Sequence, residues 1–201
     1  MLRLYNLPMP EVPEFEPSRP ASAAAVIRAV LLDPRGFYRD FSAEGPVREP
    51  ALFVLLVCGI SAVLYVLVGL VVGAVLGEIS PGRTGLTALQ AGVFALLSPV
   101  LVGVAAAVYL LSVRTFLGKV SDIREVYRML AYACSAMILA WVPVVNAIAF
   151  TYALMVLMGI AVKTVYKIPT LTAVVVCLVG FVPVASAFIW TQIALAGLLF
   201  P

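Results

Sequence analysis

The 201-residue sequence contains no histidine and few charged residues, and both shortages limit its chemistry. Without histidine, the commonest general base and the commonest metal ligand are missing. Charged residues make up 11% of the chain, against about 25% in an ordinary soluble domain, and 64% of the residues are apolar. A formal charge of +3 is too small to indicate a nucleic-acid partner. We therefore expect neither a water-soluble enzyme nor a nucleic-acid-binding protein.

Recognisable catalytic and metal-binding patterns are also lacking. Cys58, Cys134 and Cys177 lie far apart, each inside an apolar run, which matches neither zinc-site spacing nor a disulfide framework. We interpret them as small hydrophobic residues. The sequence has no glycine-rich phosphate loop, nucleophile elbow or pair of carboxylates in one plausible pocket. We therefore expect no catalytic residue, no cofactor and no metal site.

What the chain does have is long apolar runs. Four runs contain no Asp, Glu, Lys or Arg, and they cover 51–77, 84–113, 129–162 and 168–201. About 20 apolar residues in a helix cross a hydrocarbon core of about 30 Å, and a helix satisfies its own backbone polar groups. The runs predict an all-α, polytopic integral membrane protein.

The third run is too long for a single crossing. At about 1.5 Å per residue it would extend roughly 50 Å, well beyond the hydrocarbon thickness. We place its break at Trp141-Val142-Pro143, because proline cannot donate to the helical ladder and tryptophan favours the membrane interface. The fourth run contains Pro183 but is interpreted as one long span. This gives five predicted transmembrane helices, at about 51–77, 86–113, 126–141, 144–162 and 170–199.

The distribution of Lys and Arg predicts the orientation, because loops rich in these residues stay cytoplasmic. Six arginines precede residue 51. With five spans, 12 of the 13 basic residues are cytoplasmic and only Arg83 is external; with four spans the division is ten against three. We therefore expect a multi-pass protein of the cell membrane with a cytoplasmic N-terminus and an external C-terminus.

The first fifty residues have a different composition from the rest. Residues 1–20 hold five prolines among glutamates, which predicts a disordered tail. Residues 21–50 form a cytosolic segment with a predicted helix over 22–32, which ends at Asp33-Pro34. Two arrangements of this segment remain open: it lies on the inner leaflet, or it packs on the protein's own cytosolic loop. Residues 51–201 are the transmembrane domain.

Small and polar residues within the spans suggest two further features. Gly69, Gly73 and Gly77 recur every four residues, which predicts a helix-packing seam with either the second span or another copy of the chain. Uncharged polar residues also occur within the spans, and their ordinary role is hydrogen bonding between helices. A polar pathway through the membrane is the alternative, formed by Gln90, Asn146 and Gln192.

The cytosolic loop between the second and third spans holds ordinary helix-end signals. Gly118 is predicted to end the second span, and Ser121 to cap the helix that follows it.

Five short motifs lie in order along the chain: Asp33-Pro34-Arg35-Gly36-Phe37, Leu117-Gly118-Lys119, Leu130-Ala131-Tyr132-Ala133, Trp141-Val142-Pro143 and Met158-Gly159-Ile160. Their motif residues are Asp33, Pro34, Gly118, Tyr132, Pro143 and Gly159. In these motifs the chain resembles the Yip-domain family (Ypt/Rab-interacting proteins), five-span membrane proteins with a cytosolic N-terminus. The resemblance covers about residues 33–180 and is to a prokaryotic-type member.

The chain departs from the family pattern at two places. Ala136 stands where prokaryotic relatives often have proline. The acidic Asp, Tyr and Gly motif that eukaryotic members carry, linked to GTPase binding, has no counterpart in residues 1–50. The resemblance therefore does not carry GTPase binding or vesicle traffic to this chain.

Two functions remain open from the sequence. The first is a non-catalytic membrane protein that organises the lipid bilayer or recruits a partner, either a membrane protein or a second copy of the chain. The alternative is a transporter or channel for a neutral or weakly polar solute, for which Asn146 and the prolines within the spans are the evidence.

Overall fold

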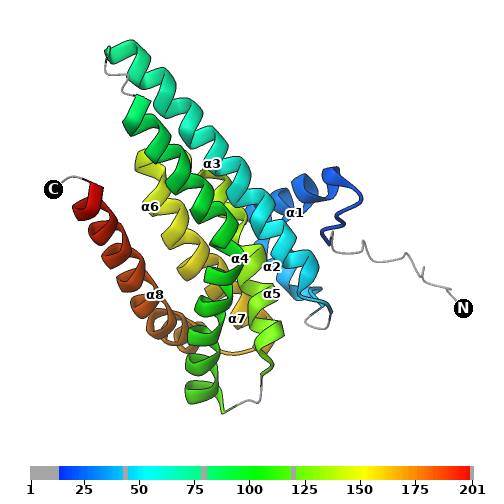
Figure 1. Ribbon diagram of the computed structural model, residues 1–201. Helices are drawn as coiled ribbons and strands as arrows, with labels where there is room; N and C mark the ends of the chain where they lie inside the picture. Colours follow the sequence, from blue (N-terminus) through cyan, green and yellow to red (C-terminus); the bar gives the residue numbers. More distant parts are fainter. Residues whose placement is uncertain (1–13, 43–44, 78–80, 119–120, 200–201) are drawn as a thin grey trace, which may run out of the picture.

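The computed structural model describes residues 14–42, 45–77, 81–118 and 121–199, and most of them are helical (Figure 1). No strand occurs in these ranges, in agreement with the predicted all-α class. The elements in chain order are α1 Pro20–Leu32, α2 Pro34–Arg39, α3 Arg48–Leu76, α4 Pro81–Leu117, α5 Ile123–Ala133, the 3-10 helix η1 Cys134–Leu139, α6 Pro143–Thr151, the π-helical η2 Tyr152–Leu157, α7 Met158–Tyr166 and α8 Thr170–Leu199.

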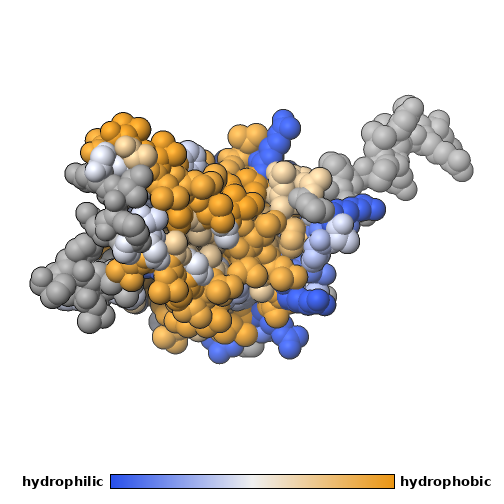
Figure 2. Space-filling model, turned by 45° about the horizontal axis from the view of Figure 1, so that its top comes forward, coloured by the Kyte–Doolittle hydropathy of each residue, from blue (hydrophilic) through white to orange (hydrophobic). Residues whose placement is uncertain are grey.

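Four helical stretches are long and apolar enough to cross a membrane: Arg48–Leu76, Thr84–Leu117, Val145–Tyr166 and Thr170–Thr191. Their outer surfaces are covered by apolar side chains, whereas charged side chains gather along one side of the molecule (Figure 2). Such a surface is suited to lipid, which has no hydrogen bonds to offer. The chain is a multi-pass membrane protein, and the fifth crossing, predicted at 126–141, stays a prediction.

The helices α3 and α4 form an antiparallel hairpin with two unlike ends (Figure 1). At one end α3 is buried through Phe53, Val54 and Val57. At the other end its apolar side chains are exposed, and Val75 is 80% exposed. We call residues 65–77 and 84–94 the tip of the hairpin. The base comprises α1, α2, α5, η1 and α7 with residues 48–61 of α3 and 98–117 of α4.

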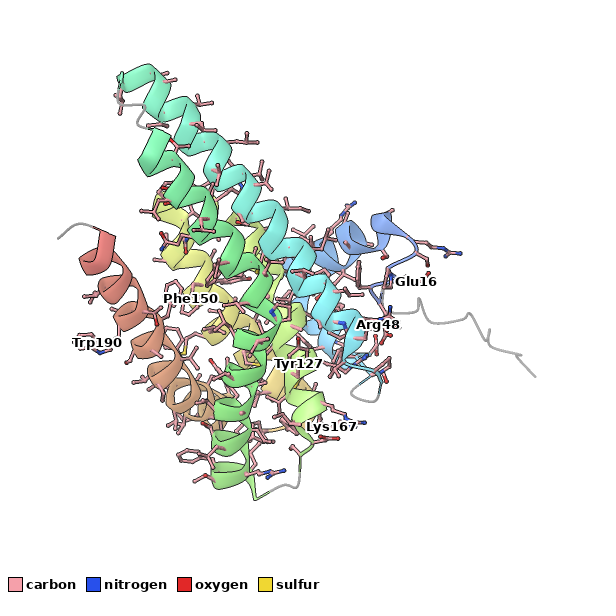
Figure 3. The ribbon with its side chains drawn as sticks, in the orientation of Figure 1. Glu16, Arg48, Tyr127, Phe150, Lys167 and Trp190 are labelled. Atoms are coloured by element: carbon pink, nitrogen blue, oxygen red, sulfur yellow. The ribbon has the colours of Figure 1, made fainter. Side chains whose placement is uncertain are left out.

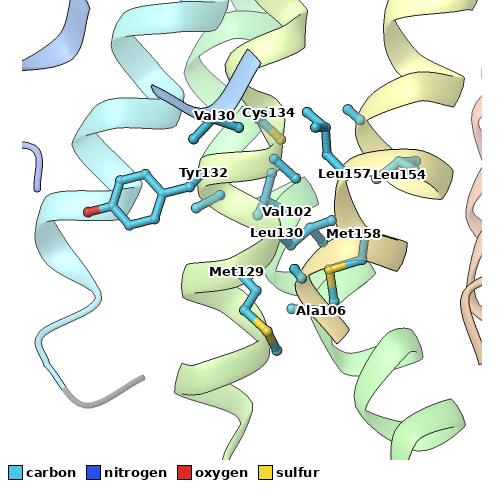
Figure 4. Packing of buried hydrophobic residues seen from close by; sticks show 14 of the residues in the cluster. Val30, Val102, Ala106, Met129, Leu130, Tyr132, Cys134, Leu154, Leu157 and Met158 are labelled. Carbon is cyan, nitrogen blue, oxygen red and sulfur yellow. The ribbon is translucent and has the colours of Figure 1, made fainter. Parts of the chain in front are cut away.

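The centre of the base is the segment α5–η1, in which residues 128–137 are all buried. Figure 4 shows apolar side chains of α1, α4, α5, η2 and α7 meeting around Leu130. The chain turns after Leu139, and α6 begins at Pro143, where the sequence places the break. Proline is well suited to this first helical position, since it has no N–H to leave unpaired and its φ is already helical.

Tyr127 anchors α5 to α4 near a proline. Its hydroxyl donates to the Pro99 carbonyl at 3.2 Å, and its ring lies 3.8 Å from where a Cβ at Gly103 would stand. Pro99 cannot donate to the Ala95 carbonyl, and the Ser98 hydroxyl donates to that oxygen instead at 2.7 Å. The proline is thus accommodated inside α4 with its orphaned acceptor satisfied.

Tyr109 of α4 contacts both η2 and α8. Its hydroxyl donates to the Leu154 carbonyl at 2.7 Å, within the π-helical turn η2. Its ring faces Gly180 of α8, where an added Cβ would stand 2.8 Å from a ring carbon. Only glycine therefore allows α8 to approach this ring so closely without a shift.

The N-terminal helices pack on the protein itself. Val26 and Val30 of α1 are fully buried in the same core as α5 and η1, and α2 contacts α7. These contacts place α1 and α2 on α5, η1 and α7, and the position of residues 21–50 relative to the inner leaflet stays a prediction. Arg28, on another side of α1, is exposed.

Two local expectations differ from the structure. The cap of α5 is Asp122, whose carboxylate accepts from the Arg124 N–H at 3.2 Å, so the prediction of Ser121 was wrong by one residue. Residues 1–13 of the tail predicted to be disordered lie outside the described residues. Residues 14–19, here called the strap, contact the base, because Phe15 finds an apolar place there and is only 5% exposed.

Candidate functional site

A cluster of aromatic rings around Tyr132 joins the N-terminal segment to α5. Tyr132 is 1% exposed, and its ring centroid lies 5.5 Å from that of Phe37, 6.0 Å from Phe41 and 5.4 Å from Phe53. Phe15 of the strap extends the cluster, with its centroid 5.6 Å from that of Phe53. Aromatic pairs at such separations each contribute about 0.5–1.5 kcal/mol beyond their buried area. The strap, α2, α3 and α5 are therefore held together at one point.

Tyr38 adds a directed bond to this packing. Its hydroxyl donates to the Met129 carbonyl of α5 at 3.1 Å, and its ring meets that of Phe37 edge to face. Burial raises the pKa of Tyr38 well above its ordinary value. The phenol therefore stays protonated at physiological pH and remains a donor.

Arg128, next to this cluster on α5, is a buried cation that is 1% exposed. Its Nη1 donates to the Pro46 carbonyl at 3.0 Å, and its Nη2 pairs with Glu14 Oε1 at 3.2 Å. The guanidinium carbon lies 5.7 Å from the centroid of the Phe41 ring, a cation–π distance. Its Nε has no hydrogen-bond partner among the described residues. A buried guanidinium needs hydrogen-bond and ion-pair partners like Pro46 and Glu14, because the loss of its hydration strongly disfavours the charge.

The loop before α3 approaches this cation closely. Gly45 has a φ of +148°, and a Cβ there would stand 2.5 Å from Arg128 Nη1. A side chain at this position would therefore conflict both with its own backbone and with the guanidinium. Gly45 allows the neighbouring Pro46 carbonyl to reach Arg128. We call Arg128, Phe41, Pro46, Phe53 and Tyr132 the Arg128 site.

The family-like motif at residues 33–37 has a structural explanation. Asp33 caps α2 and accepts from the Gly36 N–H at 3.0 Å, and Pro34 occupies the first helical position. A Cβ at Gly36 would collide with the Asp33 carboxylate, so this cap requires glycine. Phe37 then enters the aromatic cluster. The motif positions α2 against α5.

The remaining motif residues lie at helix ends and contacts. Gly118 ends α4 with a φ of +60°, a conformation that favours glycine. Pro143 begins α6. Gly159 of α7 faces α8, where a Cβ would meet Cys177 Sγ at an ordinary distance of 3.9 Å. Lys163 Nζ donates to Thr170 Oγ1 at 2.7 Å across the same pair of helices.

The predicted glycine seam lies at the tip, away from the Arg128 site. A Cβ added at Gly69 or Gly77 would meet no atom of the described chain within 4 Å, and Gly77 ends α3 with a φ of +69°. Gly73 is on the same helix and is half-buried. No other described helix packs closely on Gly69 or Gly77, so at these positions the structure does not bring a second span against the seam.

The predicted polar residues are not joined in the described structure. Gln90 of α4 and Asn146 of α6 are half-buried, and neither side chain makes a hydrogen bond within the described ranges. The side chain of Gln192 lies outside the described residues. The structure thus supplies no contact that links these three residues into a pathway.

Sequence reasoning missed the Arg128 site as a site. Arg128 was counted only as a charge that sets orientation, and Glu14 was assigned to a disordered tail. One signal was available: Arg128 is flanked by Val126, Met129 and Leu130, so helical periodicity places it beside a buried face. The 114-residue separation of Arg128 from Glu14 gave no local indication of the pair.

The comparison with protein families gives one match. A family model described as the Yip1 domain matches residues 28–193, most of the chain. No curated protein and no solved structure matches it. The matched range includes α2, the Arg128 side chain and every helix able to cross a membrane, but not the strap.

Proposed function

The chain belongs to the Yip1 domain family, and from this we propose that it is a non-catalytic protein of the cell membrane that organises the bilayer or recruits a partner at its cytosolic face. The proposal is supported by one observation above all. The N-terminal segment is docked on the base through Tyr132, Tyr38 and Arg128 rather than extending freely. A docked segment presents a pre-organised surface, and pre-organisation lowers the entropic cost of binding a partner.

The N-terminal segment exposes both arginines and acidic residues, and its arginines bear on orientation because Lys and Arg, rather than net charge, set the topology. Its exposed arginines, together with those at the starts of α3 and α5, are Arg19, Arg28, Arg35, Arg39, Arg48 and Arg124. Figure 3 places Arg48, Tyr127 and Lys167 toward the same end of the molecule, away from the tip. Basic residues next to spans favour the cytosolic side and attract anionic headgroups. We therefore propose that the side of the base that carries these arginines faces the cytosol.

Five crossings are part of the proposal. The α5–η1 segment would cross as a buried, central element, and its 3-10 portion lengthens it, since such a helix rises about 2.0 Å per residue. A tag at Met1 would then be cytoplasmic and a tag at Pro201 external. Protease protection of both tags in oriented vesicles tests this, and tags found on one side would contradict it.

Recruitment is tested by site-specific photo-crosslinking in native membranes. A photoreactive residue at Arg35, which is exposed on α2, is expected to give a discrete adduct. The same residue at Val75, at the tip, serves as the control and is expected to give none. The Arg35 adduct should weaken when Phe37→Ala loosens α2, because Phe37 holds that helix in the aromatic cluster.

The transporter alternative gives a different result. Solute flux into liposomes containing the protein, abolished by Asn146→Ala, would contradict the proposal. So would the absence of both an adduct at Arg35 and any change in the shape of reconstituted vesicles.

A further inference from the structure

We propose that the Arg128 site recognises an acidic residue followed directly by an aromatic residue, and that Glu14 and Phe15 are its resident intramolecular occupant. A partner protein's cytosolic segment carrying the same pair would take their place. This inference rests on the proposed recruitment function and names the chemistry of the partner. It is carried by three observations at the site.

The first observation is that two adjacent strap residues fill two different parts of the site. Glu14 pairs with Arg128 Nη2, while Phe15 packs against the Phe53 ring. The site therefore accepts one carboxylate and one ring from consecutive residues, a combination that a peptide supplies. A phosphate headgroup would satisfy the guanidinium alone and leave the aromatic part uncovered.

The second observation is that the resident occupant leaves part of the cation unused. One Glu14 oxygen reaches one nitrogen, Nη2, and Arg128 Nε is buried with no partner in the described part of the chain. Guanidinium groups bind carboxylates most strongly with two parallel hydrogen bonds. A carboxylate that reached both Nη2 and Nε would bind better than Glu14 does. The resident pair can thus be displaced by an occupant with better geometry.

The third observation is that the carboxylate of the occupant is accessible, whereas Phe15 and Arg128 are buried. The Glu14 side chain is 44% exposed, whereas that of Arg128 is 1% exposed. Ser22 of α1 holds the Glu16 backbone through two hydrogen bonds, so Glu14 and Phe15 can leave the site while Glu16 stays fastened to α1. Their departure would leave α1 in place and uncover a buried cation beside two aromatic rings. Such a cation strongly favours a new anionic partner, because unpaired buried charge is unfavourable.

A synthetic peptide tests the proposal. The probe is a fluorescent peptide with the sequence of residues 10–18, titrated against the full chain in detergent micelles. The receptor is the Glu14→Gln/Phe15→Ala variant, whose own strap is disabled. We expect saturable binding at least tenfold tighter than to the wild type, because the wild-type strap competes at a high effective concentration. Adding Arg128→Gln to the receptor should abolish binding.

A matched control peptide carries the same Glu14→Gln and Phe15→Ala changes and should not bind. Equal binding of the unchanged peptide to wild type and variant, or binding that survives Arg128→Gln, would overturn the proposal. The proposal would also be overturned if the unchanged peptide did not bind a correctly folded Glu14→Gln/Phe15→Ala variant. Should the variant not fold, a dye at Glu16→Cys in the otherwise wild-type chain reports strap release directly. Its emission should change when Arg128→Gln is added, and emission that Arg128→Gln leaves unchanged would overturn the proposal.

A second experiment tests whether an anionic lipid, rather than a peptide, displaces the strap. The same measurement is made in nanodiscs of neutral lipid and in nanodiscs containing phosphatidylglycerol. Strap release caused by phosphatidylglycerol and not by peptide would assign the site to lipid and overturn the proposal. The Arg35 adduct in native membranes is independent of these results, so its persistence would show that recruitment stands although the proposed recognition fails.

Discussion

Tyr132 in the base and Tyr65 in the tip differ in how deeply the protein buries their side chains. In the base, Tyr132 is 1% exposed and lies among the rings of Phe37, Phe41 and Phe53. Toward the tip, Tyr65 is 39% exposed and its neighbours on α3 are exposed apolar residues. Both regions are helical and apolar, but the base is more fully buried by the protein's own side chains, whereas contacts in the tip are fewer and include the Phe94–Phe188 ring pair. The exposed apolar side chains of the tip must obtain their burial from lipid or from another molecule.

This difference separates two requirements of a membrane protein. Crossing lipid requires only an apolar helix, and the tip supplies that with little internal packing. Positioning a cytosolic segment requires close packing and directed bonds, and these are concentrated in the base around Tyr132, Tyr38 and Arg128. Substitutions should therefore affect the two regions unequally, even when the chemical change is the same.

The largest effect is expected for Tyr132→Ala compared with Tyr65→Ala. Removing the buried ring leaves a cavity among the aromatic residues and should lower the free energy of unfolding by about 3–5 kcal/mol. The same truncation at Tyr65 should have an effect below about 1 kcal/mol, because little packing is lost there. Unfolding in mixed detergent micelles measures both. Equal losses would contradict the distinction between base and tip.

The next effect concerns two glycines on membrane-crossing helices. Gly180→Ala places a Cβ 2.8 Å from the Tyr109 ring, whose hydroxyl is fixed to Leu154, so a loss of about 1–3 kcal/mol is expected. Gly69→Ala is the control, because nothing lies within 4 Å of its Cβ. That change should be neutral or stabilise α3 by about 0.5 kcal/mol. Thermal unfolding of the two variants gives the answer, and a greater loss at Gly69 would indicate that a second molecule covers the seam.

A smaller effect is expected from the cap of α2. Asp33→Ala removes the bond from the Gly36 N–H and should lower stability by about 1 kcal/mol. Asp40→Ala, at the other end of the same short helix, is the matched control, since no hydrogen bond of its carboxylate occurs in the described structure. Hydrogen exchange of residues 34–39 measures the local effect. Faster exchange in both variants alike would show that the cap does not position α2.

The smallest effect is a response to alkaline pH. Burial raises the pKa of Tyr38 in the folded state above its unfolded value of about 10. The stability that the neutral phenol contributes is therefore complete below about pH 10 and is lost as the pH rises above it. Stability measured between pH 9 and pH 11 should fall less steeply in Tyr38→Phe than in the wild type. Identical slopes would contradict the buried donor.

The sequence predicted the features that depend on composition and local signals. Charge-free runs predicted the long helices α3, α4 and α8, Pro143 marked the start of α6, and Asp33-Pro34 marked the end of α1, whereas α2 was not predicted. The family resemblance, carried by short motifs, is confirmed by the match to the Yip1 domain. Its assignment to a prokaryotic-type member stays a prediction.

The Arg128 site could not be predicted in the same way. Its bonds connect residues 14, 46 and 128, which become neighbours only when the base is assembled. The proline and glutamate content of the strap predicted disorder. Residues 14–19 instead contact the base, where the aromatic side chain of Phe15 is buried. The error at Ser121 is of another kind, because serine and aspartate are both good caps and adjacent residues compete for the position.

The central claim is that, without a competing partner, the strap is docked on α5 through Arg128. Spin labels at Glu16→Cys and Ile123→Cys, both exposed positions, test it in a chain whose Cys58, Cys134 and Cys177 are replaced by alanine. Pulsed electron–electron double resonance should give one narrow distribution of the distance between the two labels. This distribution should broaden when Arg128→Gln is added. A broad distribution that Arg128→Gln leaves unchanged would contradict the account.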